Sequence, residues 1–290
     1  MTSKQDPRLS PASPKGLSQV KHHLRQQGRA TIRGLKKATI RDWMQAIAIP
    51  ISVALLAFFG NMITTMFNQA QYANSQRQHQ GDVEIAKDQQ RETTLQTYFD
   101  RMSDLILNDH LKTTKDYDIR NVARTRTLEV LPQLDPHRKG EIVQFLHDTG
   151  LINTGSVIVN LSQADLNQAY LKGSDLSNAD LENASLVGAN LRLAQMNAAD
   201  LSGANLMGTN LSSARLMKTN LSSADLNGAN LQFAQMGAAD LGGADLGKIN
   251  QNYAHLSGAN LSHVTGVTTA QLRRAKSLQG TIMPDGSRHP

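Results

Sequence analysis

Few residues in this 290-residue chain have the types and spacing that catalysis or metal binding requires. The chain has no cysteine, which excludes disulfides, thiol catalysis, iron–sulfur clusters and cysteine zinc sites. His137 and His147 are ten residues apart, and no further ligand pattern accompanies them. We interpret both histidines as surface residues. Because phosphate-binding loops and nucleophile motifs are also missing, the sequence predicts a protein that is not an enzyme and has no cofactor or metal.

The chemistry that the sequence does offer begins with basic side chains near the N-terminus. Residues 1–42 hold ten Lys and Arg and two acids, a charge of +8 in a chain whose net charge is +6. We predict a disordered, basic tail, because the segment opens on Pro, Ser and Lys without apolar periodicity. Basic residues near a membrane gain about 1 kcal/mol each from anionic lipids. The candidate lipid contacts are Arg29, Arg33, Lys36, Lys37 and Arg41.

An uncharged segment follows this tail and predicts a single transmembrane helix over residues 43–67. A helix of this length measures about 37 Å, more than the ~30 Å of hydrocarbon in a bilayer. Trp43 and Phe67 stand where interfacial aromatic residues are common. A cleaved signal peptide is the weaker interpretation, because no suitable cleavage site closely follows the apolar run. The tail beside this span favours lipid over nucleic acid, since it also has no interleaved aromatic residues.

The Lys and Arg residues around the span predict its orientation. Residues 23–42 contain six of them, and residues 68–87 contain two, Arg77 and Lys87. Cytoplasmic flanks carry the excess of positive charge. We therefore expect a cytoplasmic N-terminus, with the rest of the chain on the periplasmic or lumenal side.

The next segment, residues 68–156, predicts a small α-helical module. Apolar side chains from Leu95 to Ile106 follow the i, i+3, i+4, i+7 spacing of one helix face. A second helix is expected over residues 119–131, and a third opens at Asp135 with Pro136 in its first turn. A bundle this small is marginally stable alone. We expect it to dock on a neighbour or to form a homo-oligomer.

Residues 157–263 repeat every five residues. A large side chain, usually Leu, recurs from Leu161 to Leu261, with a small residue two positions earlier and Asn or Asp between them in most copies. A period of five fits neither a helix nor a strand. A chain that turns a corner every five residues can bury the large and the small side chain each time. Asn or Asp then accepts backbone N–H bonds, and Gly after the corner tolerates positive φ.

A longer period indicates twenty residues in each coil. GANLRLAQMNAADLSGANL at 188–206 recurs as GANLQFAQMGAADLGGADL at 228–246, forty residues later. In this register Asp240 and Asp245 fall on adjacent faces, so we interpret such carboxylates as structural. We expect Arg192, Arg215 and Lys218 to interrupt the acidic columns. The predicted ladders are Asn190, Asn210, Asn230 and Asn250 on one face, and Asp180, Asp200 and Asp240 with Asn160, Asn220 and Asn260 on another.

The five-residue motif resembles the A-[D/N]-L-x-x motif of the pentapeptide-repeat family. The resemblance implies a right-handed quadrilateral β-helix with four pentapeptides per coil. The preceding segment is similar to a helical module of bacterial, cyanobacterial-like, membrane-anchored members, some of which imply the alternative of a cytoplasmic repeat domain. The fold class is therefore mixed: transmembrane helix, α-helical module, β-helix and a short helical cap. That cap falls in residues 264–290, where a capping box of Thr268 and Gln271 opens the short helix TAQLRRAKSL.

One outward column of this solenoid is the candidate partner contact: Leu193, Phe233 and Tyr253, with Ser213 between. We predict a membrane-tethered scaffold or interaction module whose partner is a protein, itself membrane-associated. The resemblance also implies an alternative, a DNA-mimicking regulator of a topoisomerase or another DNA-binding protein. Eight acids and five bases in residues 157–263 disfavour such mimicry. Binding of nucleic acid itself is not expected.

Overall fold

A computed structural model describes residues 39–152 and 157–290. The chain divides into two compact units, residues 1–82 and 83–290, which are described separately. The predicted tail over 1–42 therefore lies outside the described residues, except for its last four positions.

The first unit is helical throughout its described part. Helix α2 (Ile40–Trp43) begins at a capping box between Thr39 and Asp42 and leads through the π-helix η1 (Met44–Ala48) into α3 (Ile49–Leu107). From residue 39 to 82 every side chain except the half-buried Ala48 is exposed. In the described part of the chain this is the one helix long and apolar enough to cross a membrane. The apolar side chains in this part of the helix are covered by no other described segment, as expected for side chains that face lipid.

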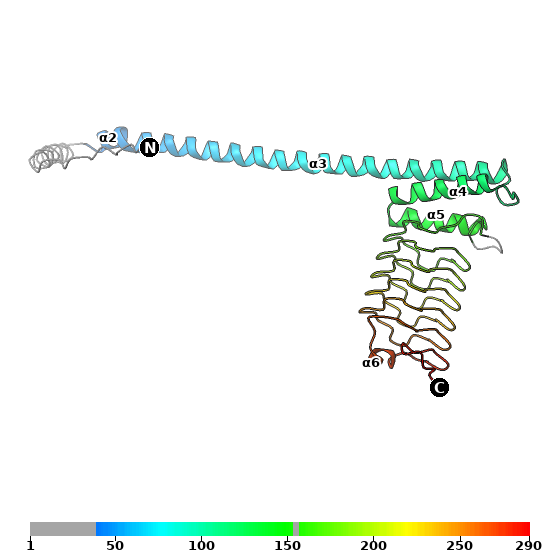
Figure 1. Cartoon of the computed structure of the whole chain (residues 1–290). Helices are drawn as coiled ribbons and strands as arrows, with labels where there is room; N and C mark the ends of the chain where they lie inside the picture. The colour runs from blue at the N-terminus through cyan, green and yellow to red at the C-terminus, as the bar shows by residue number, and fades with distance from the viewer. Residues whose placement is uncertain (1–38, 153–156) are drawn as a thin grey trace, which may run out of the picture. The chain divides into compact units, whose positions relative to one another are not determined.

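Helix α3 continues without a break to Leu107, so its last turns belong to the second unit. There it packs with α4 (Tyr117–Val130), the 3-10 turn η2 (Leu131–Gln133) and α5 (Pro136–Asp148) (Figure 1). The Tyr98 hydroxyl bonds the hydroxyl of Thr127 at 2.9 Å, and burial raises the pKa of Tyr98. The apolar face predicted for α3 is buried at Leu95, Tyr98, Met102 and Leu105.

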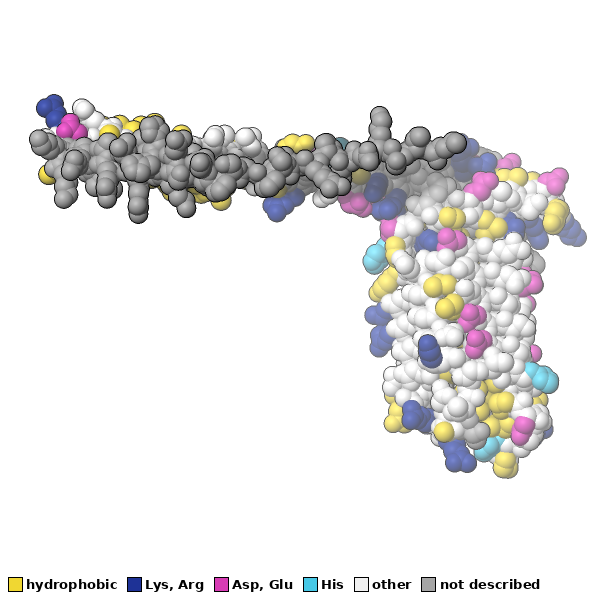
Figure 2. Space-filling view, turned by 60° about the vertical axis from the view of Figure 1, so that its left-hand side comes forward, with side chains coloured by type: hydrophobic (Ala, Val, Ile, Leu, Met, Phe, Trp, Pro, Cys, Tyr) yellow, Lys and Arg dark blue, Asp and Glu magenta, His cyan; other side chains and the backbone are white. Residues whose placement is uncertain are grey.

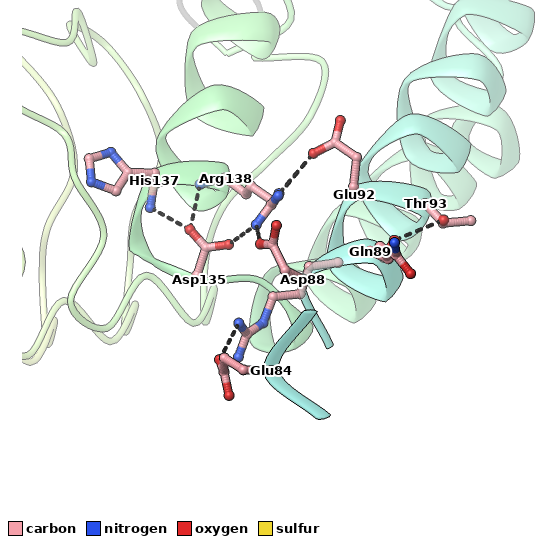
Figure 3. A network of polar contacts seen from close by, with 9 residues as sticks. Glu84, Asp88, Gln89, Glu92, Thr93, Asp135, His137 and Arg138 are labelled. Atoms are coloured by element: carbon pink, nitrogen blue, oxygen red, sulfur yellow. Dashed lines mark hydrogen bonds and ion pairs between the residues drawn. The ribbon is translucent and has the colours of Figure 1, made fainter. Parts of the chain in front are cut away.

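The predicted N-cap of α5 is present and extends into an ion-pair network (Figure 3). Asp135 accepts the backbone N–H of His137 at 3.0 Å. The Arg138 guanidinium pairs with Asp135 at 2.6 Å, Asp88 at 2.7 Å and Glu92 at 3.0 Å. Partial burial acts to raise the pKa of Asp135, but the hydrogen bonds from Arg138 and the backbone hold it below its usual range. The network therefore holds α3 against α5 at neutral pH, and its Asp135 contribution is lost as the pH falls through that lowered pKa.

Residues 157–265 form a solenoid of twenty-residue coils, and a last coil follows in which the bridges join residues twenty-two positions apart, as in His255 to Ser277. At every fifth residue a parallel bridge joins the chain to the residue twenty positions later, as in Asn190 to Asn210 and Asp180 to Asp200. Both predicted ladders are confirmed. The bridges are isolated, so the described residues contain no continuous strand; four short sides and four corners make each coil. The right-handed sense of the coils stays a prediction.

The predicted inside and outside of the coils are also confirmed. From Leu161 to Leu261 the large side chains at the fifth positions are buried, with Ala, Thr or Ser two positions earlier pointing the same way. Asp or Asn between them accepts the N–H two residues ahead, as Asp175 does from Ser177 at 2.9 Å. The second residue of each corner has positive φ. Each corner is therefore stabilised within its own repeat.

The two ends of the solenoid are covered differently. Helix α5 lies over the first coil, where the Tyr170 N–H donates to the Pro136 carbonyl at 2.8 Å and Lys139 Nζ lies 3.0 Å from Asp165 (Figure 1). At the other end the predicted helical cap is wrong in extent. Helix α6 (Thr269–Leu272) is one turn, after which the chain re-enters the solenoid with bridges at Ser277 and Ile282. Backbone groups there are satisfied by the previous coil, which a longer helix would prevent.

Candidate interaction surface

The predicted partner contacts stand in one column on the outside of the solenoid, which we call the apolar column: Leu193, Ser213, Phe233 and Tyr253. Leu193 is 46% exposed, Phe233 50% and Tyr253 55%. The rings of Phe233 and Tyr253 stack with centroids 5.2 Å apart and an interplanar angle of 9°. Stacked rings present a continuous, rigid apolar face at low entropic cost.

The backbone at the apolar column is one that large apolar residues seldom adopt. The φ angles are 64° at Leu193, 61° at Phe233 and 61° at Tyr253. Non-glycine residues in the left-handed region cost about 1 kcal/mol or more, and bulky residues there are genuine outliers. Among the described residues with positive φ, only these three are large and apolar, and all three share one column. Strain of this kind points to a function for the exposed side chains.

Basic side chains flank the apolar column. Lys172 and Arg192 occupy the position that precedes the column in its coils, and both are exposed. The carbonyl of Arg274 accepts the Tyr253 N–H at 3.0 Å, which places Arg274 in the same position one coil further on. Arg215 stands on the neighbouring face, in the bridge column of Gln195 and Gln235. The column is therefore an apolar ridge with cations beside it.

Acidic side chains gather half a coil away, on what we call the acidic edge. In residues 157–263 all but one of the carboxylates stand in two adjacent bridge columns or on the corner between them, and no Lys or Arg shares these positions. The expectation that Arg192, Arg215 and Lys218 interrupt acidic columns is therefore wrong. The column of Arg215 holds a single acid, Asp175, and the other two are corner residues. The acidic edge comprises Asp165, Asp180, Glu182, Asp200, Asp225, Asp240 and Asp245.

Figure 2 shows a solenoid surface made mainly of uncharged groups, on which charged and hydrophobic side chains stand out in small groups. The separation of charge was not predicted, although the twenty-residue register contains it, because the total charge of the repeats does not reveal how acids and bases divide among the columns. It also did not identify the positive φ of the apolar column, which follows from the corner position.

The other predicted site residues are placed as follows. Of the candidate lipid contacts, Arg41 is exposed in α2, and Arg29, Arg33, Lys36 and Lys37 lie outside the described residues. His137 is exposed, with its ring 4.9 Å from that of Tyr170. Among the described residues no group of three or more His, Asp or Glu could hold a metal ion.

Comparison with known proteins identifies the repeats. The family model described as "Pentapeptide repeats" matches with eight copies at residues 159–192, 174–212 and 194–232. A pentapeptide repeat protein from Nostoc PCC 7120 is 34% identical over 38% of this chain and 83% of its own, with a TM-score of 0.23. The chain belongs to the pentapeptide-repeat family.

Two further solved structures are similar to this pentapeptide-repeat protein. HetL, involved in heterocyst differentiation regulation in the cyanobacterium Nostoc sp. strain PCC 7120, is 26% identical over 45% of this chain and 81% of its own, with a TM-score of 0.23. QnrB1, a plasmid-mediated fluoroquinolone resistance protein, is 26% identical over 43% of this chain and 67% of its own, with a TM-score of 0.25. No curated protein matches the pentapeptide-repeat chain.

Proposed function

We propose that this pentapeptide-repeat protein is a membrane-tethered, non-catalytic scaffold whose apolar column binds a protein partner. The observation that carries the proposal is the set of three large apolar side chains held at positive φ in one exposed column. The repeat fold itself needs no such residues, since Gly, Ser and Ala occupy equivalent corners elsewhere. Side chains kept at a conformational cost and left exposed favour a binding role.

The tether is the uncharged segment over 43–67, with Arg29, Arg33, Lys36, Lys37 and Arg41 on anionic lipid. The helical module over 68–156 connects it to the repeats over 157–263, and residues 264–290 close the solenoid. The charge on either side of the span supports a cytoplasmic N-terminus and periplasmic or lumenal repeats, with cytoplasmic repeats as the alternative.

Removal of the side chains of the apolar column tests the binding role without disturbing the fold. We expect Leu193→Gly, Phe233→Gly and Tyr253→Gly together to abolish capture of the partner from cross-linked native membranes. Gly adopts positive φ without strain, so the thermal midpoint should stay the same or rise slightly. Loss of binding together with loss of structure would not fit this expectation.

A matched control uses the same backbone position in another column. Ala198→Gly, Lys218→Gly and Ala238→Gly together make the same change at corners with φ between 56° and 59°. This variant should keep the partner. Equal capture by both triple variants would refute a binding role for the apolar column.

The proposed membrane tether leads to a second prediction, which concerns how firmly the protein is held in the membrane. Full-length protein should remain in the pellet when membranes are washed with alkaline carbonate, and a variant that lacks residues 1–82 should be released. Protease added to sealed inside-out and right-side-out vesicles then shows which side carries the repeats. Release of the full-length chain by carbonate would rule out a membrane span.

The acidic edge favours one second candidate function, the regulation of a topoisomerase or another DNA-binding protein by mimicry of DNA. Six of its carboxylates, all except Asp165, which pairs with Lys139, form the surface that such a protein would contact. A supercoiling assay with the full chain distinguishes the two functions, since a scaffold leaves the topoisomerase reaction unchanged.

A further inference from the structure

The apolar column and the acidic edge lie on opposite sides of the solenoid. Ser213 in the apolar column and Ser223 on the acidic edge are ten residues apart, which is half of a twenty-residue coil. Four sides make a coil, so half a coil leads to the opposite corner. Adjacent coils are separated by about 4.8 Å, and these two corners therefore stand at nearly the same level.

The two surfaces are complementary in charge. Arg192 and Arg215 accompany the apolar column, whereas Asp180, Asp200 and Asp225 stand half a coil away at corresponding levels. Within the repeats, Asp175 lies on the side of the apolar column, and Lys218 and Lys248 lie on the two corners between the two surfaces. Opposed patches of this kind steer association and fix register.

The two surfaces are also complementary in shape. The stacked rings of Phe233 and Tyr253 project from their corner. At the level between them, the corner of the acidic edge is formed by Gly242 and Gly243, which have no side chain to obstruct a neighbour. Asp240 and Asp245 stand on either side of this bare corner. A projecting ring pair with cations and a flat corner with carboxylates fit each other.

We propose that the partner of the apolar column is the acidic edge of a second copy of this chain, so that the solenoids line up side by side. The inference rests on the proposed function, because it names the occupant of the same column. Copies tethered to one membrane meet at raised effective concentration. Since the two surfaces lie at opposite corners, a row of copies always has a free apolar column at one end and a free acidic edge at the other. The contact is heterologous and generates an open row rather than a closed dimer.

Cysteine cross-linking tests this arrangement, because the chain has no cysteine of its own. Copies that carry Ser213→Cys are mixed in lipid vesicles with copies that carry Ser223→Cys, and the vesicles are mildly oxidised. A disulfide requires Cα atoms within about 7 Å. We expect a mixed 213–223 dimer, and little product from either variant alone. A dominant 213–213 product would show two apolar columns facing each other and would overturn the heterologous row.

Charge gives an independent readout. Asp225→Asn, Asp240→Asn and Asp245→Asn together should lower the yield of the mixed dimer about fivefold. The fold should be kept, because Asn already occupies other positions in these columns. Asp175→Asn, outside the acidic edge, is the matched control and should leave the yield unchanged. Raising the ionic strength from about 0.1 M to about 1 M, which shortens the Debye length from about 10 Å to about 3 Å, should also lower it. A yield indifferent to both changes overturns the proposal.

The same samples separate this inference from the proposed function. If no dimer of any kind forms, while the glycine variants of the apolar column still lose a different membrane protein, the column binds a foreign partner and the row is excluded. If no dimer forms and the glycine variants capture the same proteins as the wild type, both proposals are refuted.

Discussion

Gly140→Ala is expected to detach helix α5 from the first coil and to destabilise the solenoid by about 2 kcal/mol or more. An added Cβ at Gly140 would overlap the Tyr170 carbonyl oxygen and would lie 3.3 Å from the carbonyl carbon. Both atoms belong to the backbone of the coil, so neither can rotate away. The helix must shift, which also breaks the hydrogen bond from Tyr170 to Pro136.

Whether Gly140→Ala lowers or raises the free energy of unfolding depends on the sizes of three opposing contributions. Inside a helix Ala is about 1 kcal/mol more favourable than Gly. Overpacking against backbone costs about 1–3 kcal/mol, and the lost hydrogen bond about 1 kcal/mol more. Thermal unfolding followed by circular dichroism gives the net change, and hydrogen exchange at the Tyr170 amide shows whether the first coil opens.

Gly81→Ala is the matched control for helix propensity. Gly81 lies inside α3, and nothing stands within 4 Å of its added Cβ. This substitution should leave stability unchanged or raise it by up to about 1 kcal/mol. If Gly140→Ala behaves in the same way, α5 does not lie against the Tyr170 backbone.

Gln251→Leu is expected to stabilise the solenoid by about 1–3 kcal/mol. Gln251 is 4% exposed, and its Nε2 has no hydrogen-bond partner. It occupies the fifth position that holds Leu211 and Leu231 in the two preceding coils, both of which are buried. A buried amide without a partner bears its desolvation cost in full, and Leu has a similar volume without that cost. A rise in the thermal midpoint of full-length protein measures the gain.

The reverse change is the control. Leu231→Gln places an amide at the same position one coil earlier and should lower the midpoint by a comparable amount. A Gln251→Leu variant with an unchanged or lower midpoint would mean that the native amide is satisfied. Neither substitution alters an exposed side chain of the apolar column, so binding should follow the wild type in both.

The coils were predictable from the sequence because their stabilising contacts are local or strictly periodic. The Ala164 N–H donates to Leu161 within one repeat, and the same bond recurs from Ala169 to Leu166. A repeat that forms its own corner hydrogen bond does not depend on a residue far away in the sequence. The twenty-residue recurrence then predicted which residues stack, and the ladder from Asn190 to Asn250 confirmed it.

The helical segments were less predictable where packing decides them. The sequence separated a span over 43–67 from a helix whose apolar face runs from Leu95 to Ile106, whereas α3 continues through the mostly polar residues between them. Those residues have no apolar face that would indicate a helix, but they include no proline to end one. Helix α6 is shorter than predicted. After its single turn, backbone hydrogen bonds to the previous coil, such as Lys276 N–H to the Ala254 carbonyl, replace the helical ones.

The sequence by itself determined the solenoid, its buried Leu and Ala, the uncharged segment and the column of Leu193, Phe233 and Tyr253. Only the tertiary structure decided that α5 covers the first coil, that Gln251 is buried without a partner and that the backbone of the apolar column is strained. The first group follows from period and composition, which every short stretch of chain carries. The second group depends on which atoms of distant segments come into contact and on the φ angle that each corner imposes. The type of a single residue does not reveal these contacts or angles.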